Sequence, residues 1–391
     1  MQKLTVLGST GSIGVNTLDV VRRWKDRYAI HALVAGGNVG LLAQQIAEFR
    51  PRLAVVADEA GRGRLVEALL GLGVNQSDWP QLEFGAQARV LSATDPDVEF
   101  VLSAIVGVAG LEATYEAVKL GKRIGLANKE VLVSGGELVM AATRAAGTEL
   151  LPVDSEHNGA HQCLRAGKRS EAVKLILTAS GGPFRKTPLE ELASVTPEQA
   201  LNHPTWKMGP RITIDSSTLM NKGFEVIEAC WLFDFTADEV EVVVHPQSKV
   251  HAMVEYNDGS VITQVCATDM RMPIQYALTY PERADAPVPK LRWDEVHTWD
   301  FHPPDWDKFP LLGLSYEAIR AGGSAGCTLN AADEVAVEAF LKGEIPYLGI
   351  AATVAETLQR VPVSSPSNVA ELLEVDRKSR EVAQAILSAS R

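Results

Sequence analysis

Two carboxylates around one serine are the first candidates for chemistry in this sequence. The segment PVDSEHNG places Asp154 and Glu156 on either side of Ser155. It fits a helix start, an acid/base pair or part of a metal site. A capping box is disfavoured, because the residues three positions after Asp154 and Ser155 are His157 and Asn158 rather than Glu or Gln. Nothing local separates two carboxyl pKa values, as an acid/base pair requires. A metal site needs a further ligand from elsewhere in the chain.

A third carboxylate comes from the later segment IDSSTLMNKGFEVIEA. Glu225 lies there in an otherwise apolar stretch, so it must face water or a partner, since burying an unpaired charge is costly. If Glu225 faces the same cavity as Asp154 and Glu156, a divalent cation must offset their repulsion. Three carboxylates with open coordination positions suit Mg²⁺ or Mn²⁺ better than zinc.

The same segment holds donors that suit a phosphate. Asn221 and Glu225 are four residues apart and share a helix face. Ser216, Asn221 and Lys222 near a helix start would make a phosphate pocket. An ordinary N-cap is the alternative role for Ser216. Ser180, in ASGGPF after a predicted strand, adds another hydroxyl.

Two further segments could complete this site. LANKE places Lys129 at the carboxyl end of a predicted strand, where it would be a counter-ion, a proton donor or merely an exposed loop lysine. HPTWKMGPR presents Trp206 and Met208 between two prolines, which favours a loop that closes over a ligand. A tryptophan packed on the body of its domain is the alternative.

A glycine loop, LGSTGSIG, follows the first predicted strand, with glycines at positions 8, 11 and 14. This pattern allows a tight turn, close backbone approach to a pyrophosphate and an anion at a helix N-terminus. A glycine-rich turn that binds nothing is the alternative. The second strand ends in VAGGN, without an acidic residue for a ribose 2′-hydroxyl, which favours NADP over NAD. Gly36, Gly37 and Asn38 also lack a basic side chain for the 2′-phosphate.

Composition restricts the class of protein. The 391 residues carry a formal net charge of −12, which argues against nucleic-acid binding because phosphate backbones are held by excess Lys and Arg. Four scattered cysteines indicate buried thiols in a reducing compartment. The longest charge-free apolar run, FVLSAIVGVAGL, is too short to span a bilayer, and the chain opens on a strand-like run without a signal peptide. We expect a soluble, cytoplasmic protein without a membrane partner.

The order of predicted elements indicates an α/β protein of several domains. Predicted strands at 4–7, 30–35, 53–57, 98–104, 123–127 and 149–153 alternate with helices, which favours a Rossmann-like parallel sheet. Later runs predict a mostly antiparallel or mixed sheet, a tight turn at Asn257–Gly259, and one long helix from about Asp215 to Phe233. The expected domains are 1–150 (dinucleotide binding), 151–280 (α+β, catalytic), 281–311 (extended proline-rich linker) and 312–391 (helical bundle).

A series of motifs in this chain resembles the 1-deoxy-D-xylulose 5-phosphate reductoisomerase family. In chain order they are LGSTGSIG, VAGGN, LANKE, PVDSEHNG, ASGGPFR, HPTWKMG, DSSTLMNKGFEVIEA, HPQSKVHAMVEY, DMRMPIQYAL and TLNAADEVAVEAFL. The resemblance implies a homodimer, joined through the sheet of the central domain. It also implies conversion of 1-deoxy-D-xylulose 5-phosphate, by retro-aldol cleavage, re-addition and reduction with NADPH, to 2-C-methyl-D-erythritol 4-phosphate. This reaction belongs to the methylerythritol phosphate route to isoprenoids.

The resemblance also assigns residues to roles. The metal, Mg²⁺ or Mn²⁺, is expected on Asp154, Glu156 and Glu225. Residues expected to bind the phosphorylated sugar are Lys129, Ser155, Glu156, Ser180, His203, Ser216, Asn221, Lys222 and Glu225. The catalytic set is Lys129, Glu156, His203 and Trp206, the last covering the substrate. NADPH is expected to contact Gly8, Thr10, Gly11, Ser12, Ile13, Gly36, Gly37, Asn38, Asn128, Glu130 and Gly209. Gly37 departs from members that carry Lys or Arg at this position, which bears on the preference for NADPH over NADH.

Two other functions remain as alternatives to this enzyme. A redox sensor that kept the dinucleotide fold would have no use for a metal-and-phosphate pocket. A metal-independent dehydrogenase would leave the three carboxylates unexplained. Turnover with and without a divalent metal separates the three hypotheses.

Overall fold

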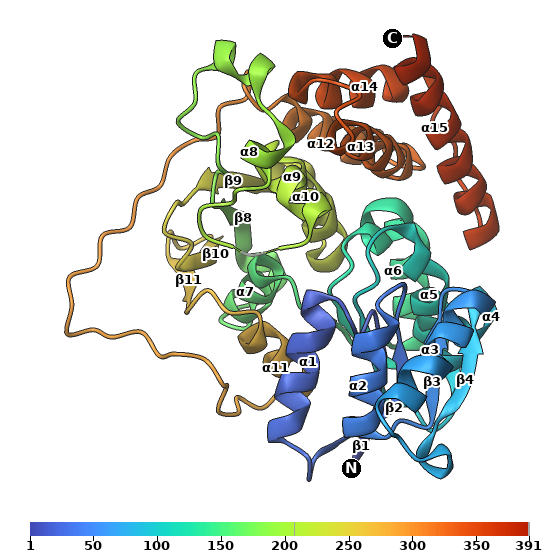
Figure 1. The fold of residues 1–391 in the computed structure, drawn as a ribbon. Helices are drawn as coiled ribbons and strands as arrows, with labels where there is room; N and C mark the ends of the chain where they lie inside the picture. The colour runs from blue at the N-terminus through green and yellow to red at the C-terminus, as the bar shows by residue number, and fades with distance from the viewer. Residues whose placement is uncertain (207, 390–391) are drawn as a thin grey trace. The chain divides into compact units, whose positions relative to one another are not determined.

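The computed structural model describes residues 1–206 and 208–389, and they form two compact units (Figure 1). The first unit comprises residues 1–131, 139–155 and 269–289. The second comprises residues 132–138, 156–268 and 290–391. The chain passes from the first unit to the second between Ser155 and Glu156, within the segment that carries two of the predicted metal ligands.

The first unit is built on a seven-stranded parallel sheet in the order β4-β3-β2-β1-β5-β6-β7. Its strands are β1 (Gln2–Leu7), β2 (Tyr28–Val34), β3 (Leu53–Val56), β4 (Gln81–Phe84), β5 (Phe100–Ser103), β6 (Arg123–Leu126) and β7 (Leu150–Pro152). The central strands are mostly buried and rich in aliphatic residues, as a sheet covered by helices on both faces requires. The predicted parallel sheet is confirmed. Of the strands in this sheet, only the edge strand β4, whose residues are exposed or half-buried, was not predicted.

Helices join these strands and bury their apolar faces on the sheet. They are α1 (Ser12–Arg23), α2 (Val39–Phe49), α3 (Glu59–Gly71), α4 (Gly85–Thr94), α5 (Leu111–Lys119), α6 (Glu130–Ala146) and α11 (Arg271–Thr279). Helix α6 is kinked at Gly135, and its residues 132–138 belong to the second unit. Helix α11 comes from much later in the chain and packs on α1, where Arg271 forms an ion pair with Asp19 at 3.0 Å.

The second unit contains a four-stranded mixed sheet in the order β11-β10-β8-β9. Its strands are β8 (Ala172–Ala179), β9 (Val240–Val244), β10 (Val250–Tyr256) and β11 (Val261–Val265). Strands β8 and β9 are parallel, whereas β10 is antiparallel to both β8 and β11. The predicted turn between β10 and β11 is confirmed, with Gly259 at φ +83°. Helices α7 (Ser155–Leu164) and α10 (Met220–Phe233) share a hydrophobic core with this sheet.

The single long helix predicted near residue 215 is wrong. Helix α9 (Pro210–Ser217) ends where the long helix was expected to begin, and α10 starts after Leu219, which adopts a left-handed φ of +60°. Pro210 at the first helical position favours initiation there. Ser216 therefore lies in the last turn of α9, and its interpretation as a helix N-cap is also wrong.

Within the predicted linker 281–311, residues 281–309 contain no helix and no strand, and a helical bundle follows from residue 310 (Figure 1). The bundle consists of α12 (Pro310–Ala321), α13 (Ala325–Leu341), α14 (Tyr347–Arg360) and α15 (Val369–Ala389). It shares a hydrophobic core with α9, α10 and the short helix α8 (Pro197–Ala200). In the part of the chain that the structure describes, 3₁₀ turns lie at 76–78, 108–110, 169–171, 189–194 and 237–239. None of the helices described is both long and apolar enough to cross a membrane.

Candidate active site

The glycine loop of the first unit is shaped by two close backbone approaches. Gly8 has φ +89°, and a Cβ at this position would lie 2.4 Å from the carbonyl oxygen of Ala104. A Cβ on Gly14 would lie 2.3 Å from the carbonyl oxygen of Gly8. Helix α1 then begins after Gly11 without a side-chain cap, so its first backbone N–H groups are open to an anion. This geometry fits the pyrophosphate of a dinucleotide.

The loops after β1 and β2 lie together at the carboxyl edge of the sheet. The backbone N–H groups of Gly8 and Ser9 both donate to the carbonyl oxygen of Val34, at 2.9 and 2.8 Å. The predicted cofactor residues of both loops are therefore neighbours. Asn38 has a structural role as well, because its side chain caps α2 by accepting from the N–H of Leu41 at 3.2 Å. A Cβ on Gly37 would meet nothing within 4 Å, so the rim is open there.

Two other predicted cofactor residues fix the loop after β5. The side-chain amide of Asn128 donates to the carbonyl oxygen of Gly107 at 3.0 Å, and a carboxylate oxygen of Glu130 accepts from the N–H of Gly107 at 3.1 Å. Strand β5 lies between β1 and β6, so this loop belongs to the same edge of the sheet.

Lys129 is paired with Asp154 inside the first unit. Its Nζ lies 2.5 Å from a carboxylate oxygen of Asp154, and the two side chains are only 7% and 14% exposed. Each residue follows one of two adjacent strands, β6 and β7. The interpretation of Lys129 as an exposed loop lysine is therefore wrong. Its positive charge is held at the sheet edge where parallel sheets bind ligands.

Lys222 lies between two predicted metal ligands in the second unit. Its Nζ is 3.3 Å from a carboxylate oxygen of Glu156 on α7 and also forms an ion pair with Glu225 on α10. The side-chain amide of Asn221 donates to the other oxygen of Glu225 at 2.5 Å. Side chains predicted to bind phosphate thus contact carboxylates predicted to bind the cation.

His157 supports this cluster from behind. Its Nε2 lies 2.8 Å from the carbonyl oxygen of Glu225, and its Nδ1 lies 3.3 Å from a carboxylate oxygen of Glu228. Both side chains are completely buried or nearly so. The ring therefore ties α7, which carries Glu156, to α10. The sequence signal for Glu228 is its spacing of three residues from Glu225, which places both on one helix face.

A hydrogen-bonded turn shapes the segment that carries Trp206. His203 accepts from the backbone N–H of Thr205 and of Trp206 through Nδ1, at 3.1 and 2.9 Å. Its Nε2 must then carry the proton and donate to the hydroxyl oxygen of Ser180, 3.0 Å away. Burial, and to a lesser extent the charge of Arg185, lowers the pKa of His203, which favours this neutral form.

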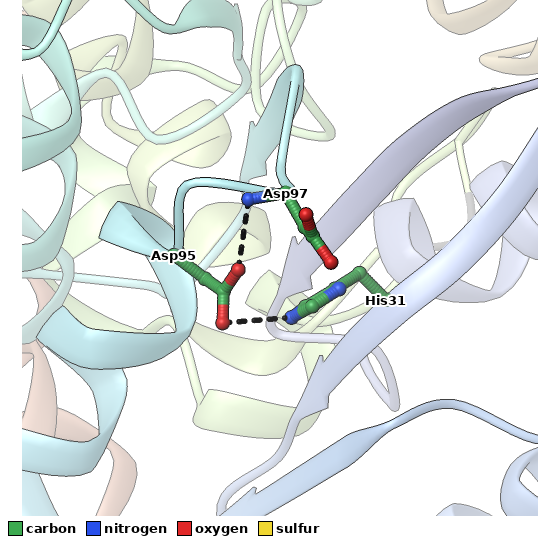
Figure 2. Close-up of side chains that lie close together, drawn as sticks. All are labelled: His31, Asp95 and Asp97. Atoms are coloured by element: carbon green, nitrogen blue, oxygen red, sulfur yellow. Dashed lines mark hydrogen bonds and ion pairs between the residues drawn. The ribbon is translucent and has the colours of Figure 1, made fainter.

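A second cluster of potential metal ligands, His31, Asp95 and Asp97, is already neutralised by ion pairs (Figure 2). His31 lies 3.3 Å from the carboxylate of Asp95, whose other oxygen accepts from the backbone N–H of Asp97 at 2.9 Å. The carboxylate of Asp97 is paired with Lys3 at 2.9 Å and Arg52 at 3.4 Å. The hydrogen bond from Lys3 lowers the pKa of Asp97. This cluster is a structural ion-pair network.

Three models of one protein family match the chain. The model described as 1-deoxy-D-xylulose 5-phosphate reductoisomerase matches residues 4–136. The model of that enzyme's C-terminal domain matches residues 150–233, and a model described as DXP reductoisomerase C-terminal domain matches residues 265–382.

Proteins of the same name are similar to this chain over nearly its full length. The chain is 66% identical to a 1-deoxy-D-xylulose 5-phosphate reductoisomerase of Solibacter usitatus (strain Ellin6076), covering 98% of this chain and 97% of that protein. It resembles the solved structure of the Zymomonas mobilis reductoisomerase in complex with NADPH, with 43% identity, a TM-score of 0.91 and 99% coverage of both chains. A DOX-P reductoisomerase in complex with NADPH, fosmidomycin and magnesium matches with 38% identity and a TM-score of 0.92, covering 99% of this chain and 98% of that one. The chain belongs to the 1-deoxy-D-xylulose 5-phosphate reductoisomerase family.

Proposed function

We propose that this chain isomerises and reduces 1-deoxy-D-xylulose 5-phosphate to 2-C-methyl-D-erythritol 4-phosphate, using NADPH and a divalent cation. The carrying observation is the buried cluster in which Lys222 lies between the carboxylates of Glu156 and Glu225. Neither a redox sensor nor a metal-independent dehydrogenase needs such a cluster. Membership of the reductoisomerase family supports the same reaction.

The donor chemistry of the site fits Mg²⁺ or Mn²⁺. Asp154 and Glu156 flank Ser155 in the chain, and Glu225 shares the ammonium of Lys222 with Glu156. Carboxylate oxygens are the preferred ligands of such hard cations. We assign the metal to Asp154, Glu156 and Glu225, where it would polarise substrate oxygens as a Lewis acid.

The glycine loop fits NADPH. Side chains are excluded at Gly8 and Gly14, and the uncapped start of α1 offers N–H groups to the pyrophosphate. The remaining predicted contacts, from Thr10 to Ile13, from Gly36 to Asn38, and at Asn128, Glu130 and Gly209, complete the proposed cofactor site. NADPH supplies the hydride when it is bound.

The polar side chains bind and orient the substrate. Lys129, held by Asp154, provides a positive charge for the carbonyl and hydroxyl end of the sugar, together with Ser155. The hydroxyl oxygen of Ser180 accepts from His203 and, at 3.3 Å, from the N–H of Gly182. Its own O–H is therefore directed elsewhere and is suited to donate to the substrate phosphate.

The other proposed phosphate donors are Ser216, Asn221 and Lys222. The turn that His203 stabilises carries Trp206, which is partly buried and would exclude water above the substrate. Lys129, Glu156, His203 and Trp206 remain the proposed catalytic set. In the division of the chain that we propose, residues 1–150 bind NADPH and residues 151–280 carry catalysis and dimerisation. Residues 281–311 form the linker, and residues 312–391 the helical domain.

A homodimer is proposed from the edge of the mixed sheet. Strand β11 is an edge strand, and its Val261 and Ile262 are 46% and 36% exposed. Exposed apolar edge strands favour pairing with another chain. Light scattering of the wild-type chain and of Ile262→Asp tests this: a dimer that the substitution weakens is expected, and a wild-type monomer would contradict it. All four cysteines are free thiols, which supports the proposed cytoplasmic location.

Oxidation of NADPH on addition of 1-deoxy-D-xylulose 5-phosphate tests the proposed reaction. We expect turnover with Mg²⁺ or Mn²⁺, none after chelation, and 2-C-methyl-D-erythritol 4-phosphate as the product. Folded protein that gives no oxidation with metal present would reject the reaction and favour a sensor. Equal turnover after chelation would favour a metal-independent dehydrogenase.

A further inference from the structure

Most backbone N–H groups of the glycine loop are used to hold the loop itself together. Those of Gly8 and Ser9 donate to the last residue of β2, and that of Gly11 donates to the carbonyl oxygen of Gly8 at 3.1 Å. The N–H of Thr10 makes no hydrogen bond within the part of the chain that the structure describes. Thr10 is half-buried, and Gly11 after it is exposed. The N–H of Thr10 is therefore a donor that the loop leaves open to a ligand.

A buried glutamine of α2 holds the neighbouring carbonyl group. The side-chain nitrogen Nε2 of Gln45 lies 2.8 Å from the carbonyl oxygen of Ser9. Because a carbonyl oxygen can only accept, the side-chain amide is the donor in this contact. Gln45 is 5% exposed and Ser9 is 0% exposed. Water is thus excluded from the contact and does not compete for the carbonyl oxygen.

This hydrogen bond sets the direction of the open N–H group. The carbonyl of Ser9 and the N–H of Thr10 belong to one planar peptide unit, which is trans, so the two groups point in opposite directions. With the carbonyl directed to the buried side chain of Gln45, the N–H of Thr10 points away from it. It thereby adds to the uncapped N–H groups at the start of α1, two residues later, as a donor for an anion.

Packing alone does not explain a glutamine at this position. Its neighbours on the buried face of α2 are Leu42, Ala43 and Ile46. The side-chain oxygen Oε1 of Gln45 is buried and has no hydrogen-bond partner among the described residues. A buried polar atom without a partner lowers stability, whereas an apolar side chain of the same length would avoid this cost. The burial of an amide here therefore indicates a role in shaping the loop.

We propose that Gln45 is a positioning residue for the dinucleotide. It holds the Ser9–Thr10 peptide unit so that the N–H of Thr10 donates to the pyrophosphate. Gln45 acts through the backbone of the loop and has no contact of its own with the cofactor. The inference rests on the proposed binding of NADPH to the glycine loop.

Steady-state kinetics of Gln45→Met test this inference, because methionine keeps the length of the side chain and removes the donor. We expect KM for NADPH to rise about fivefold, the effect of roughly one lost hydrogen bond, with kcat and KM for the phosphorylated sugar little changed. A merely structural role would lower kcat through a smaller folded fraction and leave both KM values as in the wild type. An unchanged KM for NADPH overturns the proposal.

Comparison of the two nicotinamide nucleotides locates the effect. NADPH and NADH share the pyrophosphate and differ in the 2′-phosphate, so KM for both should rise by the same factor in Gln45→Met. A rise for NADPH alone would mean that the substitution acts on the 2′-phosphate, and it would overturn the proposed role. If Gln45→Met does not fold, Gln45→Asn replaces it, since its amide is one methylene too short to reach Ser9 and the same rise is expected.

Two further variants separate the possible failures. Gln44→Met makes the same substitution at the neighbouring, exposed position, and KM for both nucleotides should not change. Gly14→Ala distorts the loop itself and should weaken NADPH binding. If it does not, the glycine loop is not the cofactor site, and that part of the proposed function fails. If it does while Gln45→Met leaves KM for NADPH unchanged, the inference about Gln45 alone is wrong.

Discussion

The glycine loop of the first unit is built from main-chain groups, whereas the lysine–carboxylate cluster of the second unit is built from side chains. The loop is made of backbone, and its shape requires that no Cβ be present at Gly8 and Gly14. The cluster is made of charged side chains, with Lys222 between Glu156 and Glu225. Backbone N–H groups attract an anion whatever the charge state of nearby residues. Buried ionic side chains depend on each other for neutralisation. We therefore expect the first site to be sensitive to substitutions that change its shape, and the second to substitutions that change its charge.

Lys222→Met should have the largest effect on stability. It leaves the buried Glu225 and the partly buried Glu156 without their shared cation, and breaking a buried ion pair costs about 3–5 kcal/mol. Thermal melts should show a large loss without metal, and Mg²⁺ should raise Tm more in this variant than in the wild type. Lys119→Met, which removes an exposed pair with Glu116, should cost less than about 1 kcal/mol. An equal rise of Tm with Mg²⁺ in the Lys222 variant and the wild type would contradict the proposal that Lys222 neutralises the carboxylates that bind the metal.

Gly14→Ala should damage the first site through shape alone. The new Cβ would lie 2.3 Å from the carbonyl oxygen of Gly8, so the loop must move, at a cost of about 3 kcal/mol. NADPH fluorescence titration should show much weaker binding, and no metal concentration should restore it. Gly63→Ala, where a Cβ meets nothing within 4 Å, is the matched control. Normal NADPH affinity in Gly14→Ala would show that the loop does not hold the cofactor.

Acid should weaken the second unit through His161 on α7. Burial, with a smaller contribution from Arg165, lowers the pKa of His161 from 6.5 to about 4. The folded state favours the neutral ring, so this stability is complete above pH 6.5 and is lost as pH falls towards 4. At pH 5 the loss amounts to about 2 kcal/mol. Urea unfolding at pH 7 and 5 should show a smaller loss in His161→Gln than in wild type, while the exposed His297→Gln behaves as wild type. Identical losses of unfolding free energy in all three proteins would show that His161 does not cause the acid sensitivity.

Gly37→Arg should produce the smallest change, a modest improvement in NADPH binding. The rim is open at this position, and a guanidinium there would lie near the 2′-phosphate. An exposed charge pair contributes up to about 1 kcal/mol, so KM for NADPH should fall about threefold while KM for NADH is unchanged. Gly37→Ala should alter neither. Equal changes for both nucleotides would show that the 2′-phosphate binds elsewhere.

The backbone-built site was predictable from the sequence because its requirements are local. Only glycine tolerates the conformation of Gly8 and the contact at Gly14, so the presence of glycine at these positions already indicates the turn. Asp154 and Glu156 could also be selected as candidate metal ligands, since they follow a predicted strand. The parallel sheet followed from strands that alternate with helices.

Features that depend on tertiary contacts could not be predicted in this way. Ser-Ser-Thr suggests a helix start, yet Ser216 lies in the last turn of α9, and the left-handed conformation of Leu219 separates α9 from α10. Arg211 lies close to both Asp215 and Asp333, which are distant in the chain, and each of these acids alone is indistinguishable from a surface acid. The engagement of Lys222 with carboxylates, rather than with phosphate alone, is visible only when α7 and α10 are packed.

Binding of Mn²⁺ and NADPH to the same samples of wild type and Glu225→Gln tests the central claim most directly. Electron paramagnetic resonance measures free Mn²⁺, and fluorescence titration measures NADPH. Loss of a carboxylate ligand should weaken Mn²⁺ binding by at least about 100-fold and depress turnover, while the backbone-built site keeps its NADPH affinity. Unchanged Mn²⁺ affinity, or a comparable loss of NADPH affinity, would contradict the assignment of the metal to Glu225.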